Sequence, residues 1–226
     1  MKTDQTTMYD ISWRKAICQG KESFGDTEVQ YRAIQLLCSG KGQRVLEIGC
    51  GTGRLVDYLS RCGFNVSGID IAPSAILWGL SFFPYRDLRI ASATATSFPD
   101  NAFDVVVSFD LIEHLQSVDL HIEEVKRVLK PGGIYFLKTP HKLSNIIFET
   151  LKSQSLKWRE YHPSLQYPGR LRKLLEHHGF SVEFIKVDIR SRYLTKKIGR
   201  LLGRFDFRFL PQWFQPNLFI IARYMA

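Results

Sequence analysis

The chain has 226 residues, and 45% of them are hydrophobic. This composition suffices for one well-buried core and is too little for two full domains. No apolar run approaches the roughly 18 uninterrupted residues of a membrane-spanning helix, and residues 1–5 lack the apolar centre of a signal peptide. We therefore expect one domain, 1–226, in the cytoplasm.

The charge is spread unevenly. Residues 1–150 carry 16 Lys/Arg and 17 Asp/Glu (net −1), whereas residues 151–226 carry 15 and 5 (net +10), which together give the total of +9. Such an asymmetry indicates an anionic partner or surface, and a solvated basic face is the alternative. The four cysteines have neither metal-ligand spacing nor the density of a disulfide scaffold, so we expect reduced thiols and no metal.

Helical and strand patterns alternate along the chain. Residues 1–40 are expected to form an N-terminal helical cap that includes an amphipathic helix at 29–38. Strands are then expected near 44–48, 65–69, 88–92, 104–108, 134–138, 181–185 and 218–224. Helices are expected over 57–61, 74–82, 118–129 and 171–178, with Pro73 suited to the first turn of the second. The Lys-Pro-Gly-Gly segment at 130–133 is expected to end a helix and turn the chain. This alternation predicts an α/β fold with a parallel sheet and helices on both faces.

The segment 44–55 is the most informative one. An apolar run at 45–48 is followed by glycine at every second position, and then by a helical pattern that begins near Leu55; the glycines are Gly49, Gly51 and Gly53. Because glycine tolerates positive φ and has no Cβ, a ligand can lie against the main chain of such a loop. The pattern predicts a buried strand that turns sharply into a helix through a ligand-binding loop.

Two other nucleotide-binding motifs do not fit this loop. A dinucleotide fingerprint needs a glycine where Arg54 stands, and a phosphate-binding loop needs a Gly-Lys-Ser/Thr triplet that is not there. A glycine-rich turn without any ligand remains the alternative at this point.

Glu47 lies in the strand beside the loop. A carboxylate there would repel a pyrophosphate but suits a ligand that carries an ammonium group. The pattern Glu-x-Gly-x-Gly-x-Gly resembles motif I of the class I S-adenosylmethionine-dependent methyltransferases, and the resemblance covers residues 40–140. It implies S-adenosylmethionine as cofactor, held by Glu47, Gly49, Cys50, Gly51 and Gly53. It also implies a Rossmann-like doubly wound seven-stranded sheet, mostly parallel with an antiparallel last strand.

The second expected strand ends in Asp70, 17 residues beyond Gly53. In a βαβ unit this position lies next to the glycine loop, where a carboxylate can accept hydrogen bonds from both ribose hydroxyls. Alone, Asp70 could be a helix-capping acid. Together with the glycine motif it is assigned to the ribose, with Ile71 beside it.

Residues 91–115 resemble the adenine and methionine-tail segments of the same family. Most relatives have an aspartate that accepts from the adenine amino group, and Ser92 stands at the matching position. A hydroxyl accepts this bond without charge assistance and therefore more weakly. The resemblance implies that adenine binding relies more on the backbone around Ala93 and Thr94 and on apolar stacking, with Phe109 at the end of the fourth strand.

Three histidines are candidates for the chemistry. A hydroxyl acceptor must lose a proton, and histidine is the usual base near neutral pH. His114 follows Glu113 in a Glu-His pair that is common in the family, and His141 follows the fifth strand, so both are predicted as catalytic residues. His162 has the least positional support. A metal held by Glu113, His114 and His141 matches no standard ligand set, so no metal is predicted.

The acceptor is expected to be a small molecule. Because ligands of open α/β sheets bind outside the carboxyl ends of the strands, four segments are expected around the methyl group: 9–24, 109–115, 139–143 and 158–167. The cofactor-binding core is expected at 41–140, and the other substrate-side segments and the last strands at 141–226.

Relatives that methylate adenine amino groups or glutamine amides typically carry Asn/Asp-Pro-Pro-Tyr/Phe after strand four, where this chain has Ser-Phe-Asp-Leu. Cytosine C5 enzymes use a Pro-Cys nucleophile, and this chain has no Pro-Cys dipeptide. The pattern is similar to methyltransferases that act on an oxygen of a quinone-, lipid- or sugar-like substrate. The rivals are an RNA methyltransferase that uses the basic C-terminal third and a non-catalytic protein that binds S-adenosylmethionine.

A helical insertion is predicted at 191–208. Leu194, Ile198, Leu201, Leu202 and Phe205 fall on one helical face, with basic residues interleaved. Two interpretations remain: a lid packed over the substrate pocket, or a basic amphipathic helix that contacts an anionic membrane.

Overall fold

The computed structural model describes residues 4–22, 31, 34, 42–146, 162–186 and 217–225. A seven-stranded sheet has the order β3-β2-β1-β4-β5-β7-β6. The strands are β1 (Arg44–Ile48), β2 (Asn65–Asp70), β3 (Asp87–Ile90), β4 (Phe103–Phe109), β5 (Leu129–Pro140), β6 (Phe180–Ile185) and β7 (Asn217–Tyr224). The first five are parallel, and β7 runs antiparallel to both β5 and β6. The predicted fold class is confirmed.

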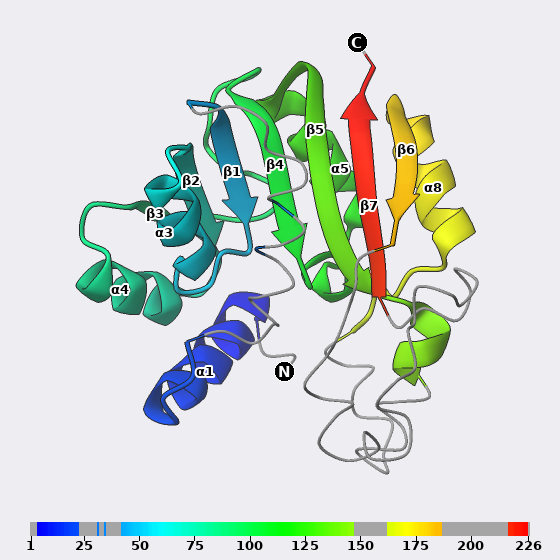
Figure 1. Ribbon diagram of the computed structural model, residues 1–226. Helices are drawn as coiled ribbons and strands as arrows, with labels where there is room; N and C mark the ends of the chain where they lie inside the picture. Colours follow the sequence, from blue (N-terminus) through cyan, green and yellow to red (C-terminus); the bar gives the residue numbers. More distant parts are fainter. Residues whose placement is uncertain are drawn as a thin grey trace, which may run out of the picture.

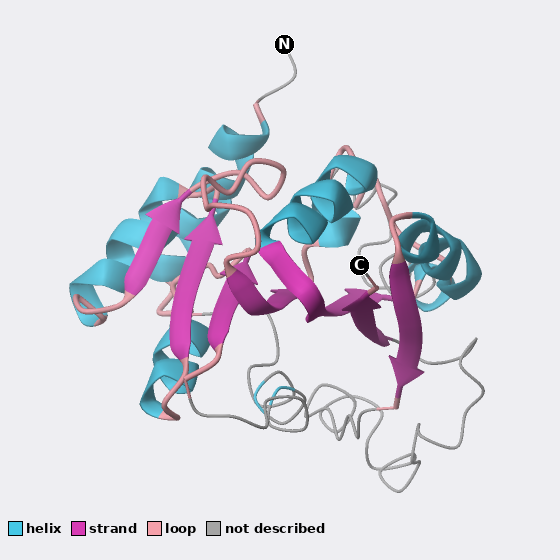
Figure 2. Ribbon diagram, turned by 90° about the horizontal axis from the view of Figure 1, so that it is seen from above, coloured by secondary structure: helices cyan, strands magenta, loops and turns pink. Residues whose placement is uncertain are grey.

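Helices cover both faces of the sheet, as Figure 2 shows from above. The helices are α1 (Gln5–Cys18), α3 (Arg54–Arg61), α4 (Pro73–Phe82), the 3₁₀ turn η1 (Ile112–His114), α5 (Val118–Val128) and α8 (Pro168–His177). Two cores result from the alternation of side chains along each strand. Leu46 packs in one core with residues of α5 and α8, and its neighbour Val45 packs in the other with residues of α3 and α4.

Local sequence explains where several helices begin. Gly53 precedes α3 in the left-handed region with φ 75°, which a residue with a Cβ rarely adopts. Pro73 occupies the first turn of α4, where its missing N–H leaves no hydrogen bond unmade. The hydroxyl of Ser117 caps α5 by accepting from the N–H of Leu120.

The fifth strand is longer than the sequence pattern predicts. We expected a turn at 130–133 and a strand at 134–138, whereas β5 begins at Leu129 and pairs it with Phe103. The register then shifts, so that Val105 pairs with Ile134. Gly132 has φ 75° inside this irregularity. The predicted chain reversal is therefore a bulge within one strand, because hydrogen bonds form on both sides of the Pro-Gly-Gly segment.

Two expected helices fall partly or wholly outside the described residues. In the helix expected at 29–38, Tyr31 and Ile34 are helical, and the rest is not described. The insertion at 191–208 lies outside the described residues, so its two interpretations remain predictions. In the part of the chain that the structure describes, no helix is both long and apolar enough to cross a bilayer.

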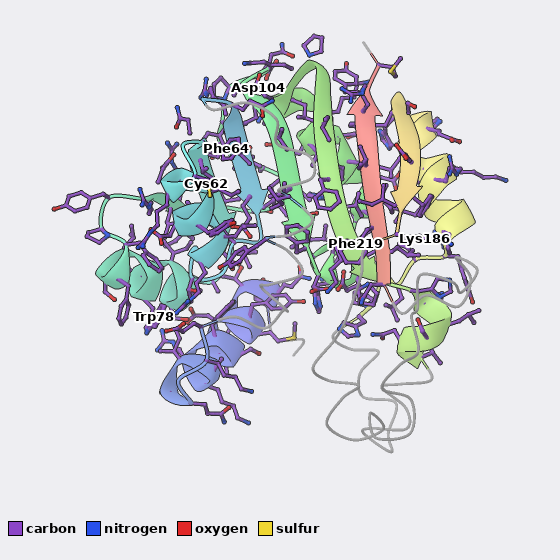
Figure 3. The ribbon with its side chains drawn as sticks, viewed as in Figure 1. Cys62, Phe64, Trp78, Asp104, Lys186 and Phe219 are labelled. Carbon is purple, nitrogen blue, oxygen red and sulfur yellow. The ribbon has the colours of Figure 1, made fainter. Side chains whose placement is uncertain are left out.

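The carboxyl ends of the parallel strands lie together at one edge of the sheet. Figure 1 shows α1, in blue, below this edge, next to α4 and to the ends of β1 and β4. Asp104, at the start of β4, lies at the opposite edge (Figure 3). Ligands of open α/β sheets bind outside the carboxyl ends of the strands, so the edge covered by α1 is where a site is expected.

Candidate active site

A cavity of about 810 Å³ opens at this edge between the strand ends and α1. Its size is within the range of small-molecule sites. It brings together eleven of the thirteen residues that the sequence singles out: Glu47, Gly49, Cys50, Gly51, Asp70, Ile71, Ser92, Ala93, Thr94, Phe109 and His114. Gly53 and His141 do not line it.

The glycine loop is held close to the end of β2. The N–H groups of Gly49 and Cys50 both donate to the carbonyl of Ile69, at 2.8 and 2.9 Å. Gly49 and Gly51 have φ of 80° and 53°. This positive φ is strained for any residue with a side chain, which explains why glycine occupies both positions.

Asp70 connects the end of β2 to this loop. One carboxylate oxygen accepts from the N–H of Gly51 at 2.8 Å, and the other accepts from Ala72 at 2.9 Å. Burial raises the pKa of Asp70, and these backbone hydrogen bonds oppose the rise. The carboxylate therefore holds the loop in place and also lines the cavity, as a ribose-binding residue must.

Glu47 is 5% exposed, and its Oε2 atom has no hydrogen-bond partner in the described part of the chain. Burial, and then the charge of Asp70, raise the pKa of Glu47 well above its ordinary value. A buried carboxyl oxygen without a partner is costly unless a ligand supplies a donor. The ammonium group of a bound amino acid moiety would be such a donor.

Ser92 forms a small polar rim with Thr94. Their hydroxyls are 3.0 Å apart, and the Ser92 hydroxyl accepts from the N–H of Thr94 at 3.2 Å. Both residues line the cavity on the side of β3, where the adenine edge is expected.

Replacement of Ser92 by aspartate should tighten the binding of S-adenosylmethionine by roughly threefold to tenfold, about 1 kcal/mol. One carboxylate oxygen can accept from the Thr94 N–H, and the other is free to accept from an amino group with charge assistance. Isothermal titration calorimetry measures the change, with Ser81→Asp on the exposed face of α4 as the control. Equal or weaker affinity in Ser92→Asp would refute the adenine-edge assignment.

A buried network supports the backbone next to Ser92. His121 is fully buried and its Nδ1 lies 2.8 Å from the carbonyl of Ala93, which can only accept, so Nδ1 carries the hydrogen. Its Nε2 then accepts from the hydroxyl of Tyr135 at 3.0 Å, and that hydroxyl accepts from Ser108 at 2.7 Å. Burial lowers the pKa of His121 to about 4, which agrees with a neutral ring. The chain Ser108–Tyr135–His121 thus fixes the position of Ala93.

Gly53 and His141 lie behind the cavity wall. A Cβ on Gly53 would meet the side chain of Leu88, and its left-handed backbone begins α3. His141 is fully buried; its Nδ1 accepts from the N–H of Leu143 at 3.2 Å, and burial lowers its pKa. Both positions are consistent with a supporting role, and neither contacts the cavity.

The other half of the cavity has aromatic and imidazole walls. The rings of Tyr9 and His114 meet edge to face at 5.6 Å, and those of His114 and His162 lie 4.8 Å apart. Burial, and then the neighbouring His114, lower the pKa of His162 to about 4. Its Nδ1 and the Oδ1 of Asn145 are buried without a hydrogen-bond partner among the described residues. All four residues line the cavity.

Helix α1 closes the cavity from below the strand ends. Gln5, Tyr9, Ser12 and Trp13 line the cavity from this helix. Asp10 accepts from the N–H of Ser74 at 2.7 Å, and Gln5 donates to the carbonyl of His114 at 2.6 Å. The helix is therefore attached to η1 at its N-terminal end and to α4 through Asp10, near its middle.

Glu113 lies fully buried at the back of this wall. The Thr139 hydroxyl donates to it at 2.9 Å. Burial, and then the charge of Asp110, raise the pKa of Glu113 to about 8. The carboxyl group is therefore protonated at neutral pH.

The ionisation of Glu113 should lower the free energy of unfolding of the parent as the pH rises. Glu113→Gln should remove this contribution. The folded-state pKa lies above the unfolded value, so the folded protein binds more protons between about pH 4.5 and 8, and its stability falls across this window. The amide cannot ionise and still accepts from Thr139. Urea unfolding at pH 5 and pH 8 should show a decrease in the parent that the variant lacks in part: the share of Glu113, on the order of a few kcal/mol, is removed, and the share of Glu47 remains. Parallel pH profiles would show that Glu113 ionises normally.

Several further residues of this site come from segments far apart in the chain. Tyr9, Trp13 and His162 lie in the segments 9–24 and 158–167 that were expected around the methyl group, whereas Asn145 was not predicted. His121 had one visible signal, since it is a polar residue in the buried stripe of α5. Among the described residues, no group of three or more His, Cys, Asp or Glu side chains is placed to hold a metal ion.

The sequence matches a protein family and several groups of known proteins. A family model described as a methyltransferase domain matches residues 25–184, more than half of the chain. A probable S-adenosylmethionine-dependent methyltransferase from Mycolicibacterium smegmatis is 32% identical over 156 residues, 69% of this chain and 58% of the relative. A ubiquinone biosynthesis O-methyltransferase from Chelativorans sp. is 35% identical over 103 residues, 44% of this chain and 41% of the relative. The matches thus span about half the length of these relatives.

The fold also has solved counterparts. An S-adenosylmethionine-dependent methyltransferase from Methanosarcina mazei superposes with a TM-score of 0.64 over 85% of this chain and 97% of that one. The two are 20% identical in sequence, so this likeness concerns the fold alone.

Proposed function

The chain belongs to the class I S-adenosylmethionine-dependent methyltransferases, whose cofactor is S-adenosylmethionine, and we propose that it methylates an oxygen of a small quinone-, lipid- or sugar-like acceptor. One observation carries the proposal. The cavity that holds the predicted cofactor residues continues into a pocket with aromatic and imidazole walls under α1. The named activity of the Chelativorans relative supports an oxygen acceptor.

The described residues fit the cofactor. Asp70 would hold the ribose, the backbone of Gly49 and Gly51 would lie against the ligand, and the unpartnered Glu47 oxygen would accept from its ammonium group. When bound, S-adenosylmethionine supplies a methyl group activated by the positive sulfonium. The protein has to align the acceptor and exclude water, since a displacement of this kind depends on geometry.

The proton of the acceptor hydroxyl would pass to the imidazole pair. His162 is neutral, and its unpartnered Nδ1 can accept a hydrogen bond from the hydroxyl. His114 lies against His162 and in edge contact with Tyr9, so it can orient the acceptor or take the proton itself. His141 has no part in this proposal because it does not line the cavity.

A methyl-transfer assay tests the proposal. The purified protein, given tritiated S-adenosylmethionine and a panel of catechols, hydroquinones and sugars, should label at least one of them. His114→Asn and His162→Asn should each lower kcat by roughly 10²–10⁴-fold. They should leave the affinity for S-adenosylmethionine within about twofold. His178→Asn, at a partly buried histidine beside Asp119 that does not line the cavity, is the matched control and should retain full activity.

The rival functions predict other results in the same assay. Label transferred to tRNA with a steep salt dependence would establish an RNA methyltransferase. Binding of S-adenosylmethionine without label in small molecules, RNA or a cell extract would indicate a non-catalytic protein. Either result would overturn the proposed acceptor.

A further inference from the structure

A second hollow of about 420 Å³ adjoins the main cavity. Gln116 and Ser117, at the start of α5, line both spaces. The second hollow lies between this turn and one side of α8, from Arg170 to His177. Most of its lining residues are polar or charged, and unlike the main cavity it has no aromatic ring apart from the imidazole of His177.

Basic side chains form the α8 wall of this hollow. Arg170, Lys173 and His177 follow one another at i, i+3 and i+7, which places them on one face of the helix. Arg170 and Lys173 form no ion pair within the described part of the chain. Arg172, on a different face, is by contrast bound to the carbonyl of Val182 at 2.8 Å. Asp119 is the acidic residue among the lining residues, and its carboxylate lies 3.5 Å from His178.

Gln166 provides a buried polar atom at the same place. The residue is 5% exposed and lines the hollow, and its Oε1 has no hydrogen-bond partner among the described residues. Its Nε2 donates to the carbonyl of Ser164 at 2.6 Å, which fixes the orientation of the amide. A buried acceptor in this state is available to a donor group of a ligand. The hollow thus offers positive charges for an anion and one acceptor for a hydroxyl group.

Hydrogen bonds of Ser164 join the walls of the two spaces. The N–H of Ser164 donates to the carbonyl of Glu113 at 3.0 Å, and its hydroxyl donates to the carbonyl of Leu115 at 2.6 Å. Glu113 and Leu115 line the main cavity, whereas Ser164 lines the second hollow. One ligand could therefore extend across the shared rim of Gln116 and Ser117.

We propose that the second hollow binds a phosphate group of the methyl acceptor, with Arg170 and Lys173 on the phosphate oxygens and Gln166 accepting from a neighbouring hydroxyl. The inference rests on the proposed function and narrows the acceptor to a phosphorylated hydroxyl compound. The phosphate belongs either to a soluble monoester or to a lipid headgroup. Paired cations that are not neutralised by acidic partners suit this ligand, since each can form charge-assisted hydrogen bonds.

Binding of simple phosphates to the full chain tests this inference without any methyl transfer. Inorganic phosphate and glycerol 3-phosphate are titrated separately, and amide NMR shifts or calorimetry report the binding. Both should bind, and glycerol 3-phosphate more tightly. The double variant Arg170→Ala, Lys173→Ala should weaken both at least tenfold, whereas Lys21→Ala, Lys126→Ala, outside both spaces, should change neither. Gln166→Met should remove the preference for glycerol 3-phosphate.

The controls separate this inference from the proposed function. All variants should bind S-adenosylmethionine with the affinity of the parent. This control would show that the substitutions leave the fold intact. Absence of phosphate binding, or equal binding in the Arg170, Lys173 variant, would overturn the subsite even if the protein methylates an acceptor. Sedimentation with phosphatidylcholine vesicles, with and without phosphatidic acid, distinguishes a lipid headgroup from a soluble monoester. Phosphate binding by a protein without methyl transfer would leave the subsite standing and refute the proposed function alone.

Discussion

Asp70→Ala is expected to weaken the binding of S-adenosylmethionine by roughly tenfold to a hundredfold, about 1–3 kcal/mol. The substitution removes the acceptor expected for the ribose hydroxyls. It also leaves the N–H groups of Gly51 and Ala72 without their partners, at 2.8 and 2.9 Å in the parent. The glycine loop should therefore lose its fixed position as well as its ligand contact.

Calorimetry with S-adenosylmethionine and with its demethylated product measures this loss. Asp104→Ala is the matched control, because Asp104, like Asp70, accepts from a backbone N–H. Asp104 forms in addition an ion pair with Lys130, and it lies at the opposite edge of the sheet (Figure 3). We expect Asp104→Ala to bind the cofactor as the parent does. If Asp70→Ala did so too, the ribose assignment would be wrong.

Gly51→Val is expected to abolish cofactor binding, with a loss of a hundredfold or more, about 3 kcal/mol. Gly51 has φ 53°, which a β-branched residue does not adopt without strain. A Cβ at this position would lie 2.4 Å from an atom of the Trp13 ring, so the new side chain would also displace α1 from the cavity. The sheet itself should remain folded, since Gly51 lies outside the strands.

Circular dichroism and calorimetry together test this expectation. Gly169→Ala is the control, because a Cβ there meets no atom within 4 Å and the backbone is not left-handed. We expect both variants to retain the parent spectrum and only Gly51→Val to lose binding. Undiminished affinity of Gly51→Val would mean that the ligand does not lie against this loop.

The carboxyl-edge position of the cofactor residues could be predicted from the sequence alone. The glycine spacing at 49–53 and the apolar strand before it are local signals, because backbone sterics and strand periodicity act over a few residues. Asp70 followed from the geometry of a βαβ unit, in which the second strand returns next to the first. The start of α4 at Pro73 was also predicted from a local signal, whereas the antiparallel last strand was expected from the family resemblance.

Only the tertiary structure decided how the acceptor half of the site is built. Tyr9, His114 and His162 meet although they are far apart in the chain, and no local pattern encodes a contact between α1, η1 and the segment before α8. The fold also gives different surroundings to two histidines that were both predicted as catalytic residues from the sequence. His114 faces the cavity, whereas His141 is buried behind its wall. The backbone of His141 pairs with that of Gln166, and its ring accepts from the N–H of Leu143, so both contacts hold it away from the cavity wall. Local sequence specifies the elements and the cofactor loop, and long-range packing selects the side chains that meet around them.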